Sequence, residues 1–282
     1  MAIETVSTKS VKTYLKKWLS LIQINSLNKS AEEQGLNVLI EKLKKKVPDI
    51  RFQYSSFKVN SLYLETKVRN QHAFQISLLD DVINRLENPV IVDIGDSAGT
   101  HLQYIQELYS ENNNIRCLSV NLDPEAIKKI KEKGFEAIQT RAENLYNYNI
   151  NVDVFLCFQT LEHLMSPINF LYELSSKTTA KYLIITVPYL KNSRVGLYHI
   201  RRGDKEDVCA ENTHIFELNP EDWKLIVRHS GWRIIKEMVY LQYPKRSLLR
   251  ITKALWRKYD FEGFYGMILE RNDVWSSRYK DW

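Results

Sequence analysis

After Pro89, short apolar runs alternate with helical segments, and this pattern constrains the fold more than any other feature of the sequence. Four of the runs are rich in β-branched or aromatic residues: Val90 to Ile94, Ile115 to Val120, Val152 to Phe158 and Tyr182 to Val187. Strands that are buried on both faces have this composition. Helical patterns lie between them, for example at His101 to Tyr109 and at Pro124 to Lys133. Strands that alternate with helices predict an α/β fold with a doubly wound, mostly parallel sheet.

The segments on either side of this alternation have different patterns. Upstream, two stripes at helical spacing predict amphipathic helices: Val11, Leu15, Trp18, Leu19 and Ile22, then Leu36, Leu39, Ile40, Leu43 and Val47. Ser30 is the expected N-cap of the second helix, and a third helix is expected at about Arg69 to Leu86. Downstream, Trp232 to Gln242 and Phe264 to Glu270 have the pattern of two further strands.

These patterns predict three parts: an N-terminal helical cap or substrate region (1–86), the sheet domain (87–272) and a short tail (273–282). The sheet domain carries a basic amphipathic insertion at about 244–260, whose apolar stripe is Leu248, Leu249, Leu255, Trp256 and Tyr259. Such a segment either packs on the sheet, lies on an anionic membrane or binds an acidic partner. The sequence leaves these three alternatives open.

The composition favours an acidic partner and a reducing compartment. The 40 Lys and Arg residues exceed the 34 Asp and Glu residues, so the net charge is +6, and a basic protein attracts phosphate, acidic sugars, nucleic acid or anionic lipid. The three cysteines are odd in number and form no CxxC pair, so neither a disulfide framework nor a zinc site is indicated. No apolar stretch approaches the roughly 18 residues that span a bilayer. We therefore expect a cytoplasmic protein.

The stretch VIVDIGDSAGTHL joins the first expected strand to the next helix. It has the spacing of a glycine-rich nucleotide-binding turn with Asp93, Gly95 and Gly99, but Ser97 replaces the middle glycine. In parallel sheets, ligands bind outside the carboxyl ends of the strands, where such a turn presents backbone N–H groups. The alternatives are a turn without a ligand, or a site for another cofactor such as NAD.

Six blocks in order, from about Pro89 to Arg271, resemble the class I S-adenosylmethionine (SAM) dependent methyltransferases, specifically the small-molecule branch typified by ubiquinone-biosynthesis enzymes. The blocks are DIGDSAG, SVNLDPEAI, AENL, FLCFQTLEHLMSP, ITVPY and HIFELNPEDWKLIVRHSGW. The resemblance implies a Rossmann-like, seven-stranded, mostly parallel sheet with an antiparallel last strand, extended here by N-terminal helices. It also implies SAM as the cofactor and S-adenosylhomocysteine as the product.

The resemblance assigns cofactor-binding roles along the ends of the first four strands. The residues it implies are Asp93, Gly95, Asp96, Ser97, Gly99, Asn121, Leu122, Asp123, Ala142, Glu143, Asn144, Phe158 and Gln159. Two positions depart from the family pattern. Asn121 stands where an acidic residue usually receives the ribose hydroxyls, and Arg141 where an Asp often meets the adenine amine. A neutral amide binds a hydroxyl without the charge assistance of a carboxylate, so weaker SAM binding is expected unless Asp123 contributes.

Methyl transfer to an oxygen requires in-line alignment and removal of a proton. His214 and His163 are the candidate bases, because a neutral imidazole titrates near working pH. The alternative for each is a structural role: His163 as a residue that packs or caps its helix, and His214 as a partner of backbone in a loop. Glu162 is either a base or an ordinary carboxylate at a helix N-terminus. No HxxxH pair or carboxylate cluster stands out, so the sequence predicts no metal.

The long connection from Tyr189 to Thr213 has the length of a lid or binding loop. Its basic residues, together with His72 of the N-terminal region, are the candidate substrate-binding residues: Arg194, His199, Arg201, Arg202 and His72. These arginines would bind an acidic acceptor, or remain solvated, and His72 would otherwise be a surface residue.

We expect O-methylation of an acidic sugar, in a surface polysaccharide made at the inner membrane face. A quinone or lipid-like acceptor and a catalytically weak interaction module are the alternatives. A nucleic-acid substrate is disfavoured for two reasons. The basic residues are scattered, and the sequence at the end of the fourth strand is CFQT rather than an asparagine-proline-proline-aromatic signature. The oligomeric state is left open.

Overall fold

The computed structural model describes residues 8–53, 58–110, 114–195, 213–245 and 262–280, with the side chains of 8–16 excepted. The predicted N-terminal stripe at Val11 and Leu15 and most of the amphipathic insertion lie outside this description. The same holds for His199, Arg201 and Arg202 of the long connection. In the part of the chain that is described, no helix is long and apolar enough to cross a membrane.

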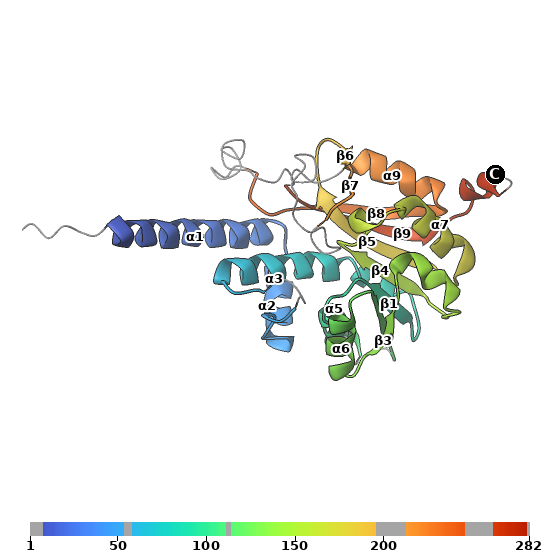
Figure 1. Cartoon of the computed structure of the whole chain (residues 1–282), viewed down its shortest axis with the longest axis horizontal. Helices are drawn as coiled ribbons and strands as arrows, with labels where there is room; N and C mark the ends of the chain where they lie inside the picture. Colours follow the sequence, from blue (N-terminus) through green and yellow to red (C-terminus); the bar gives the residue numbers. More distant parts are fainter. Residues whose placement is uncertain (1–7, 54–57, 111–113, 196–212, 246–261, 281–282) are drawn as a thin grey trace, which may run out of the picture.

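One seven-stranded sheet forms the centre of the molecule (Figure 1), with the strand order β3-β2-β1-β4-β5-β9-β8. Its parallel strands are β1 (Val90–Ile94), β2 (Arg116–Asn121), β3 (Glu136–Gln139), β4 (Val154–Phe158) and β5 (Tyr182–Tyr189). The last strand, β9 (Gly263–Arg271), runs antiparallel between β5 and β8 (Trp232–Leu241). The predicted mostly parallel sheet with an antiparallel last strand is therefore confirmed.

Successive side chains along the central strands enter two separate cores, one on each face of the sheet, because a strand has a side-chain period of two. Ile91 belongs to the core that includes the N-terminal helices and α5 (Thr100–Tyr109). Val92 belongs to the core beneath α7 (Pro167–Lys177) and α9 (Pro220–His229). On the β2–β3 side, α6 (Pro124–Glu132) packs against both strands.

The N-terminal region is helical, as expected: α1 (Thr8–Glu33), α2 (Asn37–Lys46), α3 (Leu62–Ser77) and α4 (Asp80–Ile83). In Figure 1, α1 extends away from the body of the molecule while α3 crosses toward the sheet. Phe74 of α3 stacks on Tyr240 of β8, with ring centroids 5.5 Å apart. A Cβ at Gly266 of β9 would lie 2.9 Å from the Phe74 ring. The absence of a side chain at Gly266 therefore allows Phe74 of α3 to pack closely on the sheet.

Two helix boundaries differ from the sequence predictions. Ser30 does not cap the second helix, because α1 continues to Glu33 and the buried Ser30 hydroxyl donates to the Leu241 carbonyl at 2.5 Å. The third helix begins earlier than predicted, at Leu62, and a break at Leu78 separates it from α4. Ser61 caps it by accepting a hydrogen bond from the Leu64 N–H at 3.3 Å.

Three short elements lie near the ends of the strands. Two are 3-10 turns, η1 (Ala142–Asn147) before β4 and η2 (Leu161–His163) directly after it. The third is a separate two-stranded ladder between β6 (Arg194–Val195) and β7 (Phe216–Glu217). A last 3-10 turn, η3 (Ser276–Tyr279), lies in the predicted tail.

Candidate functional site

The glycine turn follows β1 at the point where the order of the strands reverses, between β1 and β4. Gly95 has φ +91° and Gly99, the N-cap of α5, has φ +71°, which is backbone that favours glycine. A Cβ at Gly95 would also lie 2.3 Å from Thr160 Oγ1. Ser97 is not among the described residues with positive φ. Serine is therefore accommodated without backbone strain where the family pattern has glycine.

Two buried carboxylates lie beneath this turn. Asp93 and Asp96 are 1% and 2% exposed, and Asp93 Oδ2 lies 3.0 Å from Nδ1 of His101. His101 Nε2 lies 3.1 Å from Oε1 of Gln75 on α3. Both partners accept hydrogen bonds at these atoms, so the arrangement suits an imidazolium that donates from both nitrogens. The sequence analysis missed both His101 and Gln75.

Mutual interactions shift the pKa values of this group. Burial and the charge of Asp96 raise the pKa of Asp93 to about 6, although the hydrogen bond and charge of His101 oppose the shift. Burial tends to lower the pKa of His101, but its hydrogen bond to Asp93 and the charges of both carboxylates outweigh burial and raise it. Asp93 Oδ1 and both Asp96 carboxylate oxygens are buried without a hydrogen-bond partner among the described residues. The turn therefore offers three buried acceptor atoms to a cationic ligand.

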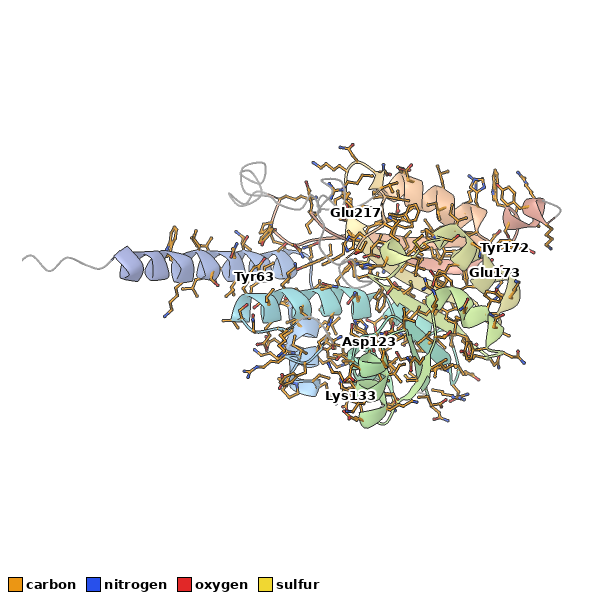
Figure 2. The ribbon with its side chains drawn as sticks, in the orientation of Figure 1. Tyr63, Asp123, Lys133, Tyr172, Glu173 and Glu217 are labelled. Carbon is orange, nitrogen blue, oxygen red and sulfur yellow. The ribbon has the colours of Figure 1, made fainter. Side chains whose placement is uncertain are left out.

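The end of β2 supports the turn rather than presenting free side-chain groups. Asn121 Nδ2 donates to the Asp96 carbonyl at 3.3 Å, and its Oδ1 accepts from the Asp123 N–H at 2.8 Å. Asp123 immediately precedes α6 (Figure 2) and caps it by accepting from the Glu125 N–H at 2.9 Å. Leu122 between them is half exposed. Both side chains considered for the ribose are thus already engaged in holding the backbone.

The AENL block forms η1, which contacts β2. It carries the three residues that the family pattern places near the adenine, Ala142, Glu143 and Asn144. Arg141, which precedes them, forms an ion pair with Glu143 at 3.5 Å. The arginine at this departure from the family pattern therefore has a local carboxylate partner.

The end of β4 approaches the glycine turn. Gln159 has φ +52°, one of two positive values among the described non-glycine residues, and its N–H donates to the Thr186 carbonyl of β5 at 2.8 Å. Thr160 Oγ1 donates to the Ile94 carbonyl at 3.1 Å. The Phe158 ring packs edge-on against His101, with centroids 5.1 Å apart. Unusual backbone of this kind is concentrated at functional sites.

Immediately after this bend, the structure brings together both predicted bases. The rings of His163 and His214 are perpendicular, with centroids 4.6 Å apart. His163 Nδ1 donates to the Thr213 carbonyl at 2.8 Å, and His214 Nδ1 lies 2.9 Å from Glu217 Oε1. Glu217, on β7 (Figure 2), also accepts from Arg194 Nε. Glu162 is fully buried beside them, and neither of its oxygens has a hydrogen-bond partner within the described chain.

Burial is the largest single influence on the pKa values of Glu162, His163 and His214 in this second cluster. It raises the pKa of Glu162 to about 7, against the opposing charge of His214, and it lowers the pKa of His163 to about 4, with a contribution from the charge of His214. Burial also tends to lower the pKa of His214, but the hydrogen bond to Glu217 and the charges of Glu162 and Glu217 raise it overall. At neutral pH, His163 is therefore a neutral imidazole.

The predicted substrate residues are placed as follows. Arg194 forms an ion pair with Glu217 across the β6–β7 ladder, so its charge has a carboxylate partner within the fold. His72 is buried on α3, with its ring 4.9 Å from that of His101 and its Nδ1 3.5 Å from the Tyr104 hydroxyl. The alternative of a surface His72 is therefore wrong. A cavity of about 490 Å³ lies between α1 and the ends of β5 and β8.

The comparisons with known proteins agree with this architecture. Residues 92–178 match the family model described as "Methyltransferase domain", from β1 to just beyond α7. No sequence among the curated proteins matches the chain. A similar solved structure is the Burkholderia thailandensis 1,6-didemethyltoxoflavin-N1-methyltransferase, with bound 1,6-didemethyltoxoflavin and S-adenosylhomocysteine. It is 15% identical, covers 86% of this chain and 90% of that chain, and has a TM-score of 0.52.

Two further structures share the fold. A Listeria monocytogenes protein assigned to the SAM-dependent methyltransferases is 12% identical, with 72% of this chain and 98% of that chain covered and a TM-score of 0.51. The 4+2 cyclase SpnF is 11% identical, with 86% and 97% covered and a TM-score of 0.54. Because a cyclase has this fold too, the reaction must be argued from the site.

The strand order, with its reversal between β1 and β4, defines a Rossmann-like methyltransferase fold. Residues 92–178 match the methyltransferase-domain model, the sheet has the fold of the class I SAM-dependent methyltransferases, and SAM is the cofactor of that class. The residues present fit that cofactor. The methionine end of SAM carries an ammonium group, and the oxygens of Asp93 and Asp96 that lack a hydrogen-bond partner are buried acceptors at the turn where it would bind. When bound, SAM supplies an electrophilic methyl group, and Asp93 and the turn would hold its amino-acid end.

Proposed function

We propose that the protein transfers a methyl group from SAM to a hydroxyl of an acidic sugar, in a surface polysaccharide. The observation that carries this proposal is the cluster of Glu162, His163 and His214 directly after β4, beside the glycine turn. A hydroxyl is a weak nucleophile until its proton leaves, and imidazole and carboxylate side chains assist that departure. A lone pair of the hydroxyl oxygen attacks the methyl carbon, the sulfur keeps the electron pair of the broken bond, and the proton leaves through the cluster.

The cavity between α1 and the sheet is a candidate acceptor pocket. Tyr189, the last residue of β5, and Tyr243 line it together with Lys245 and Glu33. Its volume of about 490 Å³ lies within the usual range for small-molecule sites. Aromatic faces pack against sugar rings, and the lysine offers a cation to an acidic group. The net charge of +6 favours the same class of acceptor.

Two alternatives have their own support. The tyrosine lining of the cavity would also accommodate a quinone or lipid-like acceptor. The engagement of Asn121 and Asp123 in backbone hydrogen bonds favours weak SAM binding, as expected for a catalytically weak interaction module. The proposed location is cytoplasmic, at the inner membrane face. It rests on the basic amphipathic sequence at 244–260, which lies almost entirely outside the described residues.

Calorimetric titration of the purified protein with SAM, and separately with S-adenosylhomocysteine, tests the proposal first. Micromolar binding of either ligand supports it, and a screen of acidic sugars and glycans against quinone-like acceptors then identifies the substrate class. Binding of neither ligand would contradict the proposal and favour the interaction module.

Replacement of one predicted base separates catalysis from cofactor binding. We expect His214→Gln to lower turnover by about 10²- to 10⁴-fold, the usual contribution of proton-transfer assistance, and to leave the affinity for SAM near the wild-type value. Steady-state assays with the acceptor from the screen and calorimetry measure the two quantities. An equal loss of SAM affinity would place His214 in the cofactor site instead.

A further inference from the structure

We propose that Glu162, His163 and His214 bind a divalent transition-metal ion, of the Zn²⁺ or Mn²⁺ type, beside the position of methyl transfer. One ligand atom from each side chain lies within 4.8 Å of the others. Two imidazoles and one carboxylate suit such ions. The sequence analysis predicted no metal, since His214 is far from the other two residues in the chain and no local motif connects them.

The hydrogen bonds of the two histidines leave the correct nitrogens free. His163 Nδ1 faces the Thr213 carbonyl at 2.8 Å, which can only accept, so Nδ1 carries the proton and Nε2 of the neutral ring has a lone pair. His214 Nδ1 faces the Glu217 carboxylate at 2.9 Å, so Nδ1 again carries a proton, and Nε2 becomes available when metal binding displaces its own proton. Metal-binding histidines typically use their other ring nitrogen in this way, which fixes the tautomer and the ring orientation.

Glu162 supplies an independent observation. Its carboxylate is 0% exposed and has no hydrogen-bond partner among the described residues, and Oε1 lies 4.0 Å from His163 Nε2. A buried carboxylate without a partner is costly unless a cation or donor compensates it. An ion placed among the three side chains would compensate this charge.

The surrounding fold holds the cluster in place. Arg194 binds Glu217 across the β6–β7 ladder, and Glu217 in turn orients His214. The Ile215 N–H donates to the Glu162 carbonyl at 2.7 Å, which joins the segment of His214 to the turn after β4. Arg194, Glu217 and His214 thus form a chain of contacts that begins in the β6–β7 ladder and ends at the proposed metal site.

The acidic group under the glycine turn is less suited to a metal. Asp93, Asp96 and His101 also lie close together, but His101 directs Nδ1 to Asp93 and Nε2 to Gln75, so neither ring nitrogen is free. That group is also the one that fits the cofactor ammonium. Among the described residues, the cluster after β4 is therefore the better metal site.

The metal would assist the reaction of the proposed function, on which this step of the inference rests. Three protein ligands leave coordination positions open, and an acceptor hydroxyl bound there has a lowered pKa. Its proton passes to water, the oxygen lone pair forms the bond to the methyl carbon, and sulfur retains the pair of the broken bond. His163 and His214 then act as ligands rather than as direct bases.

Metal binding is tested without reference to activity. The full-length protein is stripped with EDTA and dialysed, then titrated with ZnCl₂ and MnCl₂ by calorimetry, and its Co²⁺ form is examined by visible absorption. We expect about one ion per chain, with the Co²⁺ spectrum of a nitrogen and oxygen site. Glu162→Gln and His214→Gln should each weaken binding by about tenfold or more. His229→Gln, which alters a histidine packed on Trp275, is the matched control and should bind as wild type.

Parallel titration of the stripped protein with SAM separates the two proposals. Metal binding without SAM binding would support the metal site and contradict the methyltransferase function. SAM binding and methyl transfer by metal-free protein would support the function and overturn the metal role. Failure of the wild type to bind any of the three ions, or unchanged binding in both Glu162→Gln and His214→Gln, would overturn the site itself. Circular dichroism shows whether each variant is folded, and the two variants alter different segments.

Discussion

At the scale of single residues, the glycine turn shows which positions of a motif are physically required. Gly95 and Gly99 have positive φ, whereas Ser97 does not. A Cβ at Gly95 would meet Thr160 Oγ1 at 2.3 Å, whereas a Cβ at Gly99 would lie 3.4 Å or more from its neighbours. Gly95 is therefore constrained by both backbone and packing, and the substituted position is the tolerant one.

Gly95→Ala should abolish SAM binding, because the new methyl group and Thr160 cannot both keep their positions at the end of the turn. The matched control is Gly134→Ala. Gly134 has φ +85° and nothing within 4 Å of an added Cβ, so the control carries the backbone strain of about 1–2 kcal/mol without the collision. Calorimetry with SAM should show binding by the control alone. Comparable SAM binding by both variants would mean that the Thr160 side chain can move away from the added methyl group.

The pKa of Asp93 predicts how cofactor affinity depends on pH. Burial and the charge of Asp96 raise this pKa to about 6, with His101 opposing. Below about pH 6 the carboxyl group is protonated and no longer attracts the cofactor ammonium. SAM affinity should therefore fall with decreasing pH, by up to about tenfold per unit, in titrations between about pH 5 and 7.5. Asp93→Asn should bind weakly at every pH, and a flat wild-type profile would contradict the assignment.

The same raised pKa predicts that the stability of the fold depends on pH in the opposite direction to SAM affinity. The folded state binds the Asp93 proton more tightly than the unfolded state, so Asp93 makes folding less favourable as pH rises through the window from about 4 to about 6. At pH 7, Asp93→Asn should therefore melt at a higher temperature than wild type although it binds SAM poorly, as is common for functional residues. The difference in melting temperature should shrink toward pH 4. A lower melting temperature at pH 7 would show that the His101 contact outweighs the cost of burying the charge.

At the scale of elements, the sequence predicted the strands whose residues have a clear local pattern. The runs that became β1, β2, β4 and β5 are buried and apolar, so composition identified them. It missed β3 (Glu136–Gln139), a short edge strand in which no residue is buried. Ser30 lies inside α1, where its hydroxyl donates to the Leu241 carbonyl, a tertiary partner that no local rule includes.

For the candidate site too, the sequence predicted the residues that belong to continuous motifs and missed the pairs that only tertiary packing brings together. The order of motif blocks located the glycine turn and both histidines, because each block is continuous in the chain. No pattern links Gln75 of α3 to His101 of α5, or His214 to Glu162, since tertiary packing creates these pairs.

The contact between Gln75 of α3 and His101 of α5 connects the N-terminal region to the candidate cofactor site. Gln75→Ala removes the acceptor of His101 Nε2, which should cost about 1–3 kcal/mol in unfolding free energy and weaken SAM binding, because His101 then no longer positions Asp93. Gln71→Ala, on the same helix but only partly buried, is the control. Chemical denaturation and calorimetry measure both effects. Unchanged SAM affinity in Gln75→Ala would restrict α3 to a purely structural role.

At the scale of the whole molecule, the N-terminal helices and the sheet share one core. The buried cluster on that face joins Leu43 of α2 and Phe74 of α3 to Ile91 of β1, Ile184 of β5 and Ile268 of β9. Polar contacts cross the same boundary, since the Gln34 side chain both donates to and accepts from the backbone of Leu241. The division at residue 86 that the sequence predicts thus crosses a continuous core.

Two truncated chains test whether the helical region is separable. A chain that begins at residue 37 loses Ser30 and Gln34 but keeps α2 and α3, so it should fold with a reduced melting temperature and still bind SAM. A chain that begins at residue 87 uncovers the sheet face under Phe74 and removes Gln75, so it should be insoluble or expanded and unable to bind the cofactor. Circular dichroism, gel filtration and calorimetry distinguish these states. A soluble, cooperatively melting 87–282 chain with wild-type SAM affinity would instead make the N-terminal helices an independent domain, and the cofactor site would then depend on the sheet alone.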